Sequence, residues 1–128
     1  MTLPPRLESE LDELTRASYN IEVVEEPDFI NLVFKGFPLG PGFNMAQSDL
    51  LLMIPRAYPD AGPDMFWVDP GVMLASGQIP QSAETVEQRL NRPWRRFSWH
   101  RQGSPWNPTI DNLRGHIEFV QRRLKESR

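Results

Sequence analysis

The stretch YNIEVVEEPDFINLVFKGF, residues 19–37, decides the fold class. Its two halves, 19–26 and 28–37, are rich in β-branched and aromatic residues, which is typical of strands, and they meet at Pro27. So short a connection requires antiparallel neighbours, because parallel strands need a crossover of a dozen or more residues. The stretch therefore predicts a β-hairpin at the start of an antiparallel sheet.

The chain that follows extends this sheet. FNMAQSDLLLMIP (43–55) and DMFWV (64–68) predict a third and a fourth strand, so the sheet is expected to be a four-stranded antiparallel meander. Residues 69–91 have a looser pattern and are predicted to form a long irregular segment with at most one helical turn. PWRRFSWH (93–100) then resumes a strand-like alternation, which places four side chains on one side: Trp94, Arg96, Ser98 and His100.

A helix is predicted at each end of the chain. Near the N-terminus, leucines recur at helical spacing and predict an amphipathic helix over 4–17, with acidic residues such as Glu10 facing outward. Near the C-terminus, Asn107 is a suitable N-cap, Pro108 suits the first helical position, and an apolar stripe runs from Ile110 to Leu124. The expected fold class is α+β, with helices packed on an antiparallel sheet.

Length and composition restrict the class of protein. The 128 residues match one domain over 1–128, and thirteen prolines argue against a bundle of long helices. No apolar run approaches the roughly 18 residues that span a membrane. The absence of cysteine excludes disulfides and thiolate zinc sites, and two histidines make a metal site improbable. We therefore expect no membrane partner, metal or cofactor, and a cytoplasmic location.

The net charge of −3 hides an uneven distribution. Residues 89–128 hold ten Arg and Lys against three Asp and Glu, whereas residues 1–88 hold four against fourteen. Such asymmetry raises the alternative of a nucleic-acid-binding module that uses the basic part and its tryptophans. The C-terminal helix carries no continuous basic face, so nucleic acid is an unlikely partner and the charges are expected to be solvated.

Three features at fixed spacing carry a resemblance to a known family. Tyr58-Pro59 with Pro63, in IPRAYPDAGPDMFWV (54–68), is similar to the Tyr-Pro-x-x-Pro-Pro turn of ubiquitin-conjugating (UBC) enzymes, and WNPTIDNL (106–113) is similar to their Trp-Ser-Pro motif. Ser98 lies eight residues before Trp106, where the family has its catalytic cysteine. More narrowly, the chain resembles prokaryotic E2 family E over positions 4–126, which implies a UBC-like fold.

The resemblance implies that Ser98 accepts the C-terminal acyl group of a ubiquitin-like protein as an oxyester. A serine hydroxyl needs a general base, and His100 is the candidate, because positions i and i+2 of a strand point to the same side. Arg96 and Arg101 are candidate oxyanion or cargo-binding residues.

Asp69 is assigned to the same site. Asp69-Pro70-Gly71 is the nearest match to the family's His-Pro-Asn, and it lacks the amide that the family's asparagine supplies. Asp69 or Asp111 is also a candidate to orient His100.

The same resemblance implies the partners. These are a ubiquitin-like protein and an adenylating, ThiF-like activating enzyme, with a metallopeptidase in the same pathway. The sequence leaves a second function open, that of a catalytically inactive UBC-like adaptor that binds a ubiquitin-like protein or activating enzyme without forming a covalent product.

Overall fold

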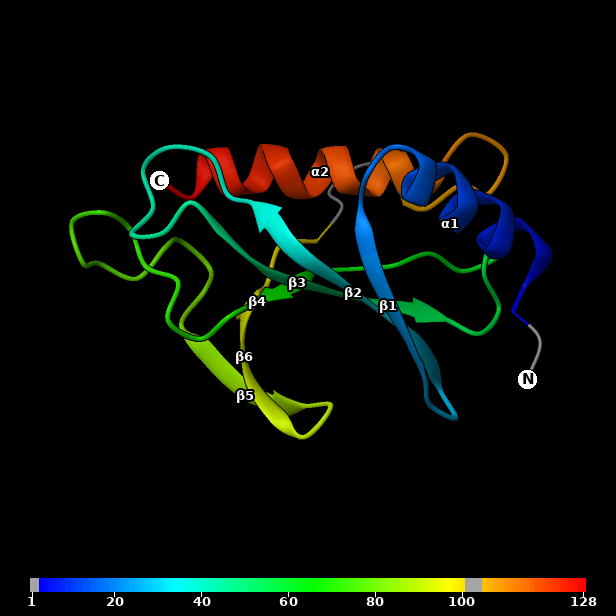
Figure 1. Ribbon diagram of the computed structural model, residues 1–128, viewed down its shortest axis with the longest axis horizontal. Coiled ribbons are helices and arrows are strands. Elements are labelled where there is room, and N and C mark those ends of the chain that lie inside the picture. The colour runs from blue at the N-terminus through cyan, green and yellow to red at the C-terminus, as the bar shows by residue number, and fades with distance from the viewer. Residues whose placement is uncertain (1–2, 101–104) are drawn as a thin grey trace.

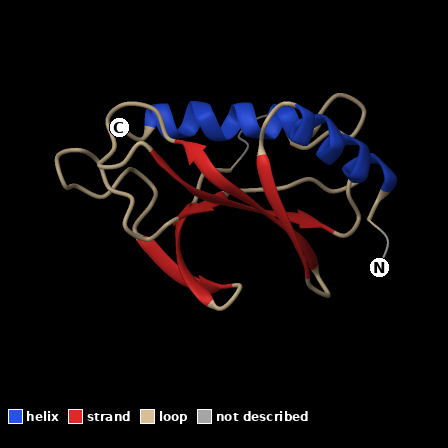
Figure 2. Ribbon diagram, in the orientation of Figure 1, coloured by secondary structure: helices blue, strands red, loops and turns tan. Residues whose placement is uncertain are grey.

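The computed structural model describes residues 3–100 and 105–128, which form two helices and six strands (Figures 1 and 2). In chain order these are α1 (Pro5–Arg16), β1 (Asn20–Glu25), β2 (Phe29–Pro38), β3 (Gln47–Pro55), β4 (Phe66–Val68), β5 (Thr85–Arg89), β6 (Arg92–Phe97) and α2 (Leu113–Glu126). All strand pairs are antiparallel, and the sheet order is β1-β2-β3-β4-β6-β5. Neither helix is long and apolar enough to cross a membrane.

Both helices lie on one face of the sheet, as Figure 2 shows. Leu7, Leu11 and Leu14 of α1 are buried against this face, as the helical spacing of the leucines predicts. Apolar residues of α2 join the same core: Leu113, Ile117, Phe119, Val120 and Leu124. The α+β class and the two-layer arrangement are therefore confirmed.

The other face of the sheet carries a second apolar cluster without a helix over it. Its buried members are Val33, Leu51, Met53, Trp67 and Trp94. The β5–β6 hairpin bends away from the sheet on this side (Figure 1), and Trp94 of β6 is only 1% exposed. The site described below lies where this helix-free face meets the end of β6.

The prediction of four strands and an irregular segment over 69–91 is wrong, because that segment contains β5. β5 pairs with β6 through a two-residue turn, Leu90-Asn91, in which both residues have positive φ (52° and 62°). Turns of this kind usually contain glycine, and here neither residue is glycine. β5 is also an edge strand of polar residues, so it carries little apolar alternation.

The C-terminal helix begins at Leu113 and not at Pro108. Asn107 instead forms a separate turn, in which its side-chain Oδ1 accepts the Thr109 N–H at 2.9 Å. The helix N-cap is Asn112, whose side chain accepts the Gly115 N–H at 2.8 Å. Ile110, predicted to lie in the buried stripe, is 74% exposed.

Glu10 is not turned to solvent as the helical pattern suggested. Its Oε1 accepts the Tyr58 hydroxyl at 2.5 Å and the Leu113 N–H at 2.7 Å, and its Oε2 pairs with Arg6 at 2.7 Å. A carboxylate at the N-terminus of α2 is favoured by the helix dipole. Glu10 therefore ties α1, the turn at Tyr58 and the start of α2 together.

Candidate active site

Ser98 follows β6 directly, and the fold fixes its backbone. Phe97, the last residue of β6, is fully buried and stacks on Phe66 of β4 with ring centroids 4.8 Å apart. The Ser98 N–H donates to the carbonyl of Ser82 at 2.8 Å, so the segment before β5 is held beside it. The serine itself is half-buried, which leaves one side of it open to solvent.

The Ser98 hydroxyl is bonded to an arginine. Arg96 Nε donates to Ser98 Oγ at 2.9 Å, and Arg96 Nη1 pairs with Glu87 Oε2 at 3.3 Å. Glu87 Oε1 in turn accepts the indole N–H of Trp67 at 2.7 Å. This chain of polar contacts runs across β6, β5 and β4 on the helix-free face, and it holds a cation beside the hydroxyl.

His100 is paired with a carboxylate that the sequence did not single out. His100 Nδ1 lies 2.7 Å from Asp64 Oδ2, and the two side chains are 60% and 51% exposed. A carboxylate only accepts, so Nδ1 carries a hydrogen in this bond, and Nε2 of the neutral ring is left as the acceptor. Within the described residues no hydrogen bond joins Ser98 to His100.

Asp69 lies at the other end of β4 from this group. It follows Val68, whose partner in β6 is Arg95, whereas Ser98 follows Phe97, whose partner is Phe66. The Asp69 carboxylate bonds to Arg92 and accepts the Asp49 N–H at 3.2 Å. The structure therefore shows two pairs, Arg96 with Ser98 and His100 with Asp64, and it places Asp69 at the other end of β4 with Arg92.

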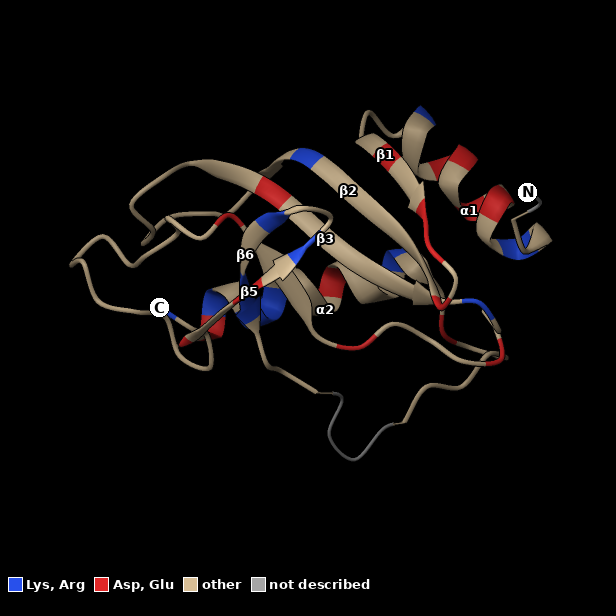
Figure 3. Ribbon diagram, turned by 90° about the horizontal axis from the view of Figure 1, so that it is seen from below, with Lys and Arg blue, Asp and Glu red and all other residues tan. Residues whose placement is uncertain are grey.

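Other candidates have different surroundings. Asp111 accepts the Asn107 N–H at 2.8 Å, so its carboxylate supports the turn before α2. Arg101 lies outside the described residues. Basic residues occur along β6 and α2, as the blue segments of Figure 3 show. No group of three or more histidine and acidic residues in the described ranges is arranged to hold a metal ion.

The segment that carries Asp64 is held by the residues of the two family-like motifs. The Trp106 indole N–H donates to the Pro59 carbonyl at 2.7 Å, and its ring lies 5.7 Å from the Tyr58 ring. A Cβ added to Gly62 would lie 2.0 Å from the Trp106 ring, so only glycine fits there. Tyr58, Pro59 and Trp106 therefore fix the backbone two residues before Asp64.

The chain matches a family of known proteins over nearly its whole length. The model of the family described as Prokaryotic E2 family E matches residues 6–127. The chain belongs to prokaryotic E2 family E. No curated protein and no solved structure shows significant similarity to it.

This match confirms the resemblance to prokaryotic E2 family E that the sequence suggested. It associates the chain in general terms with ubiquitin-like conjugation, and with a ubiquitin-like protein and an activating enzyme as partners. The sequence did not identify Asp64 as a site residue, because Asp64 was placed in a predicted strand. The structure gives the residue that follows, Met65, a positive φ of 52°, which a methionine in the sequence does not indicate.

Proposed function

We propose that this member of prokaryotic E2 family E accepts the C-terminal acyl group of a ubiquitin-like protein as an oxyester on Ser98. The observation that carries the proposal is that the Ser98 hydroxyl is bonded to a cation, Arg96, and lies two residues before an imidazole, His100, which is held by Asp64. The donor is an adenylating, ThiF-like activating enzyme. We propose a cytoplasmic location for the reaction, with a metallopeptidase in the same pathway.

In the acyl-transfer step, Ser98 Oγ attacks the activated carbonyl carbon of the ubiquitin-like protein. The C–O ester bond forms, and the bond from that carbon to the leaving group of the activating enzyme breaks. The Ser98 proton passes to His100 Nε2, directly after a side-chain rotation or through one water, and Asp64 stabilises the imidazolium. In the next step an amine of the target attacks the ester. The C–N bond forms, the bond from the carbonyl carbon to Ser98 Oγ breaks, His100 returns its proton to Oγ, and the amine gives a proton to the imidazole.

Arg96 has a separate role in this step. Its Nε donates to a lone pair of Ser98 Oγ, so the hydroxyl hydrogen stays free to be taken by a base. A fixed cation beside Ser98 Oγ favours the negative charge that this oxygen carries as its proton leaves. We assign Arg96 to this stabilisation, with Arg101 as a second cation for the cargo.

The test is formation of a covalent adduct. Incubation with the activating enzyme, its ubiquitin-like protein and ATP is expected to give an adduct that survives thiol reductant and is cleaved by hydroxide, as an ester is. Ser98→Ala is expected to abolish it, and His100→Gln to slow it by about 10²–10⁴-fold, the usual contribution of a general base. If Ser98→Ala forms the same adduct, the assignment is wrong.

A second function, that of an inactive adaptor, is favoured by one observation. Ser98 Oγ is bonded to Arg96, and no hydrogen bond to His100 exists among residues 3–100 and 105–128. An adaptor would bind the ubiquitin-like protein or the activating enzyme, and Ser98→Ala would bind equally well. Calorimetric binding without any hydroxide-labile adduct would select this function over the first.

A further inference from the structure

Two segments of the chain, 36–48 and 70–83, contain no charged residue. They are thirteen and fourteen residues long, although 24% of the whole chain is Asp, Glu, Lys or Arg. Figure 3 shows that neither segment carries a blue or red residue. Charged residues are mostly found on protein surfaces, so their absence from two loop segments sets this part of the surface apart.

The two segments are joined into one surface by contacts between their backbones. Phe43 and Leu74 form an antiparallel bridge, and the Asn44 N–H donates to the Met73 carbonyl at 2.9 Å. The Asn44 side chain accepts the Met73 N–H at 3.0 Å and donates to the Gly71 carbonyl at 2.9 Å. Figure 1 shows both segments at the end of the molecule where α2 ends. We call this surface, made of residues 36–48 and 70–83, the uncharged lobe.

The uncharged lobe faces solvent and is not part of the protein core. Twenty of its residues are exposed or half-buried, and standard interfaces take roughly 20–30 residues from each partner. Depletion of charge and enrichment in methionine distinguish the centre of an interface from the rest of a protein surface. The accessible apolar residues of the lobe include Pro38, Pro41, Met45, Met73, Leu74 and Ile79.

The uncharged lobe carries both an apolar projection and an apolar hollow. Ile79 is 48% exposed, and it follows a tight turn in which the Gly77 N–H donates to the Leu74 carbonyl at 2.8 Å. The hollow lies on the loop between β2 and β3 and measures about 520 Å³. Ile79 does not line this hollow and no charged residue does. The apolar side chains that line it come from Pro38, Pro41, Phe43, Met45 and Ala46.

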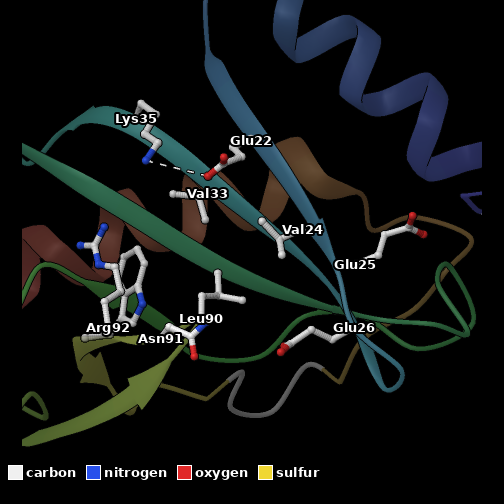
Figure 4. Close-up of a pocket in the computed structure, with 10 residues that line it drawn as sticks. Glu22, Val24, Glu25, Glu26, Val33, Lys35, Leu90, Asn91 and Arg92 are labelled. Atoms are coloured by element: carbon white, nitrogen blue, oxygen red, sulfur yellow. Dashed lines mark ion pairs between the residues drawn. The ribbon is translucent and has the colours of Figure 1, made fainter.

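A hollow on the helix-free face has the opposite chemistry and serves as a comparison (Figure 4). It measures about 430 Å³, and its charged lining residues are Glu22, Glu25, Glu26, Lys35 and Arg92. In a two-fold contact between identical chains, each surface meets a copy of itself, so charges near the axis meet like charges and repel. The uncharged lobe avoids this repulsion, and the charged hollow does not.

We propose that the uncharged lobe binds a second copy of this chain in a two-fold contact, in which Ile79 of each copy enters the hollow of the other. One projection and one hollow on the same surface give two identical contacts when the copies are related by a two-fold axis. Arg128, which donates to the Pro41 carbonyl at 2.6 Å, lies at the edge of the lobe, where a charge stays hydrated. This dimer goes beyond the proposed function and does not depend on the chemistry of Ser98.

Sedimentation velocity of the whole chain tests the dimer. Between about 1 and 300 µM we expect the average mass to rise from that of the monomer towards twice that value, as mass action requires. Ile79→Lys places a charge in the apolar hollow, and it is expected to raise the dissociation constant of the dimer at least about tenfold. Ala46→Glu is expected to do the same from the side of the hollow. Ile110→Lys, the matched change at a loop isoleucine outside the lobe that is 74% exposed, is expected to leave the dissociation constant within about twofold.

A mixture of the two disruptive variants tests which residues meet. In a dimer of one Ile79→Lys chain and one Ala46→Glu chain, the new lysine faces the new glutamate, and the second contact is that of the wild type. We expect the mixture to associate at least about tenfold more tightly than either variant alone, because the like-charge and desolvation costs are removed. Circular dichroism of each variant checks that it is folded.

Several results would overturn the inference. A monomer at every concentration, an equal loss of association in Ile110→Lys, or no recovery in the mixture would each exclude the proposed contact. Growth of the mass beyond that of a dimer would exclude its two-fold symmetry. Ser98→Ala is expected to dimerise as the wild type does, so an absent oxyester with an intact dimer would fault the chemistry of Ser98. An oxyester on a strictly monomeric protein would fault the dimer alone.

Discussion

A serine hydroxyl is a weak nucleophile unless its surroundings change the balance between its neutral and ionised forms. Ser98 has Arg96 at 2.9 Å on one side and, two residues further along the chain, an imidazole whose other nitrogen is held by Asp64. In the proposed reaction, the cation would favour negative charge on the oxygen and the imidazole would take the proton. The bound cargo would exclude water and bring the hydroxyl and the imidazole into line.

At the scale of single residues, Gly62 is predicted to be essential for the position of the Trp106 ring. Gly62→Ala would place a methyl group 2.0 Å from the Trp106 ring, so the ring must move and lose its bond to the Pro59 carbonyl. Overpacking of this kind costs about 1–3 kcal/mol. Urea unfolding is expected to show a free energy of unfolding lower by that amount.

Gly71→Ala is the matched control for this substitution. The nearest atom to its added Cβ is the Met45 methyl carbon at 3.7 Å, an ordinary contact, and the position does not require a positive φ. We expect its effect on unfolding to be within about 0.5 kcal/mol. Equal losses in the two variants would mean that the Trp106 contact with Gly62 is not what stabilises this segment.

At the scale of elements, the segment before β5 is held to β6 by a buried arginine. Arg95 is 5% exposed, and its guanidinium donates to two backbone carbonyls: Nη1 to Ala83 at 2.7 Å, and Nε and Nη2 to Pro70 at 3.1 and 3.0 Å. Its planar fork supplies donors in fixed directions, which lysine does not. The segment fixed in this way carries Ser82, whose carbonyl binds the Ser98 backbone.

Arg95→Met is therefore predicted to destabilise the protein and to loosen this segment. The buried Ala83 carbonyl and the half-buried Pro70 carbonyl would lose their donors, and a buried group left unsatisfied costs about 1–3 kcal/mol. Chemical denaturation is expected to show a loss of at least 2 kcal/mol, and amide exchange at Ser98 is expected to accelerate. Arg89→Met, which removes an exposed arginine, should change stability by less than about 0.5 kcal/mol; a comparable loss there would contradict the role of the two carbonyls.

The strands and helices differ in how far the sequence alone predicts them. The hairpin of β1 and β2 and the leucine face of α1 follow from strong local patterns, and both agree with the structure. β5 was missed because an exposed edge strand carries no apolar alternation and its turn lacks glycine. The pairing of His100 with Asp64 joins residues 36 positions apart, and such a contact depends on the fold rather than on local spacing.

At the scale of the whole molecule, one buried hydrogen bond connects the helix layer to the turn that precedes the site. The Tyr58 hydroxyl is bonded to Glu10 of α1, and the same carboxylate accepts the first N–H of α2. Tyr58 is 2% exposed and its ring contacts Trp106. The position of the Asp64 segment therefore depends on how α1 and α2 are held together, far from the chemistry itself.

This arrangement predicts a loss of stability at alkaline pH that depends on one tyrosine. Burial, and then the hydrogen bond and negative charge of Glu10, raise the pKa of the Tyr58 hydroxyl well above its ordinary value of about 10. Above about pH 10, Tyr58 of the unfolded chain releases its proton while Tyr58 of the folded protein keeps it. The free energy of unfolding therefore falls by up to about 1.4 kcal/mol per pH unit. Well below pH 10, Tyr58 is protonated in both states, and its contribution to stability is fully present.

Tyr58→Phe isolates this contribution from the other groups that titrate at high pH. At pH 8 the variant is expected to be about 1–3 kcal/mol less stable than the wild type, because the Tyr58 hydrogen bond to a charged group is lost. Between pH 9.5 and 11 the wild type should lose stability faster than the variant, so the difference between their free energies of unfolding narrows as pH rises. Urea titrations at half-unit steps measure this difference, and a gap that stays constant across the range would show that the Tyr58 proton is not held by burial and Glu10.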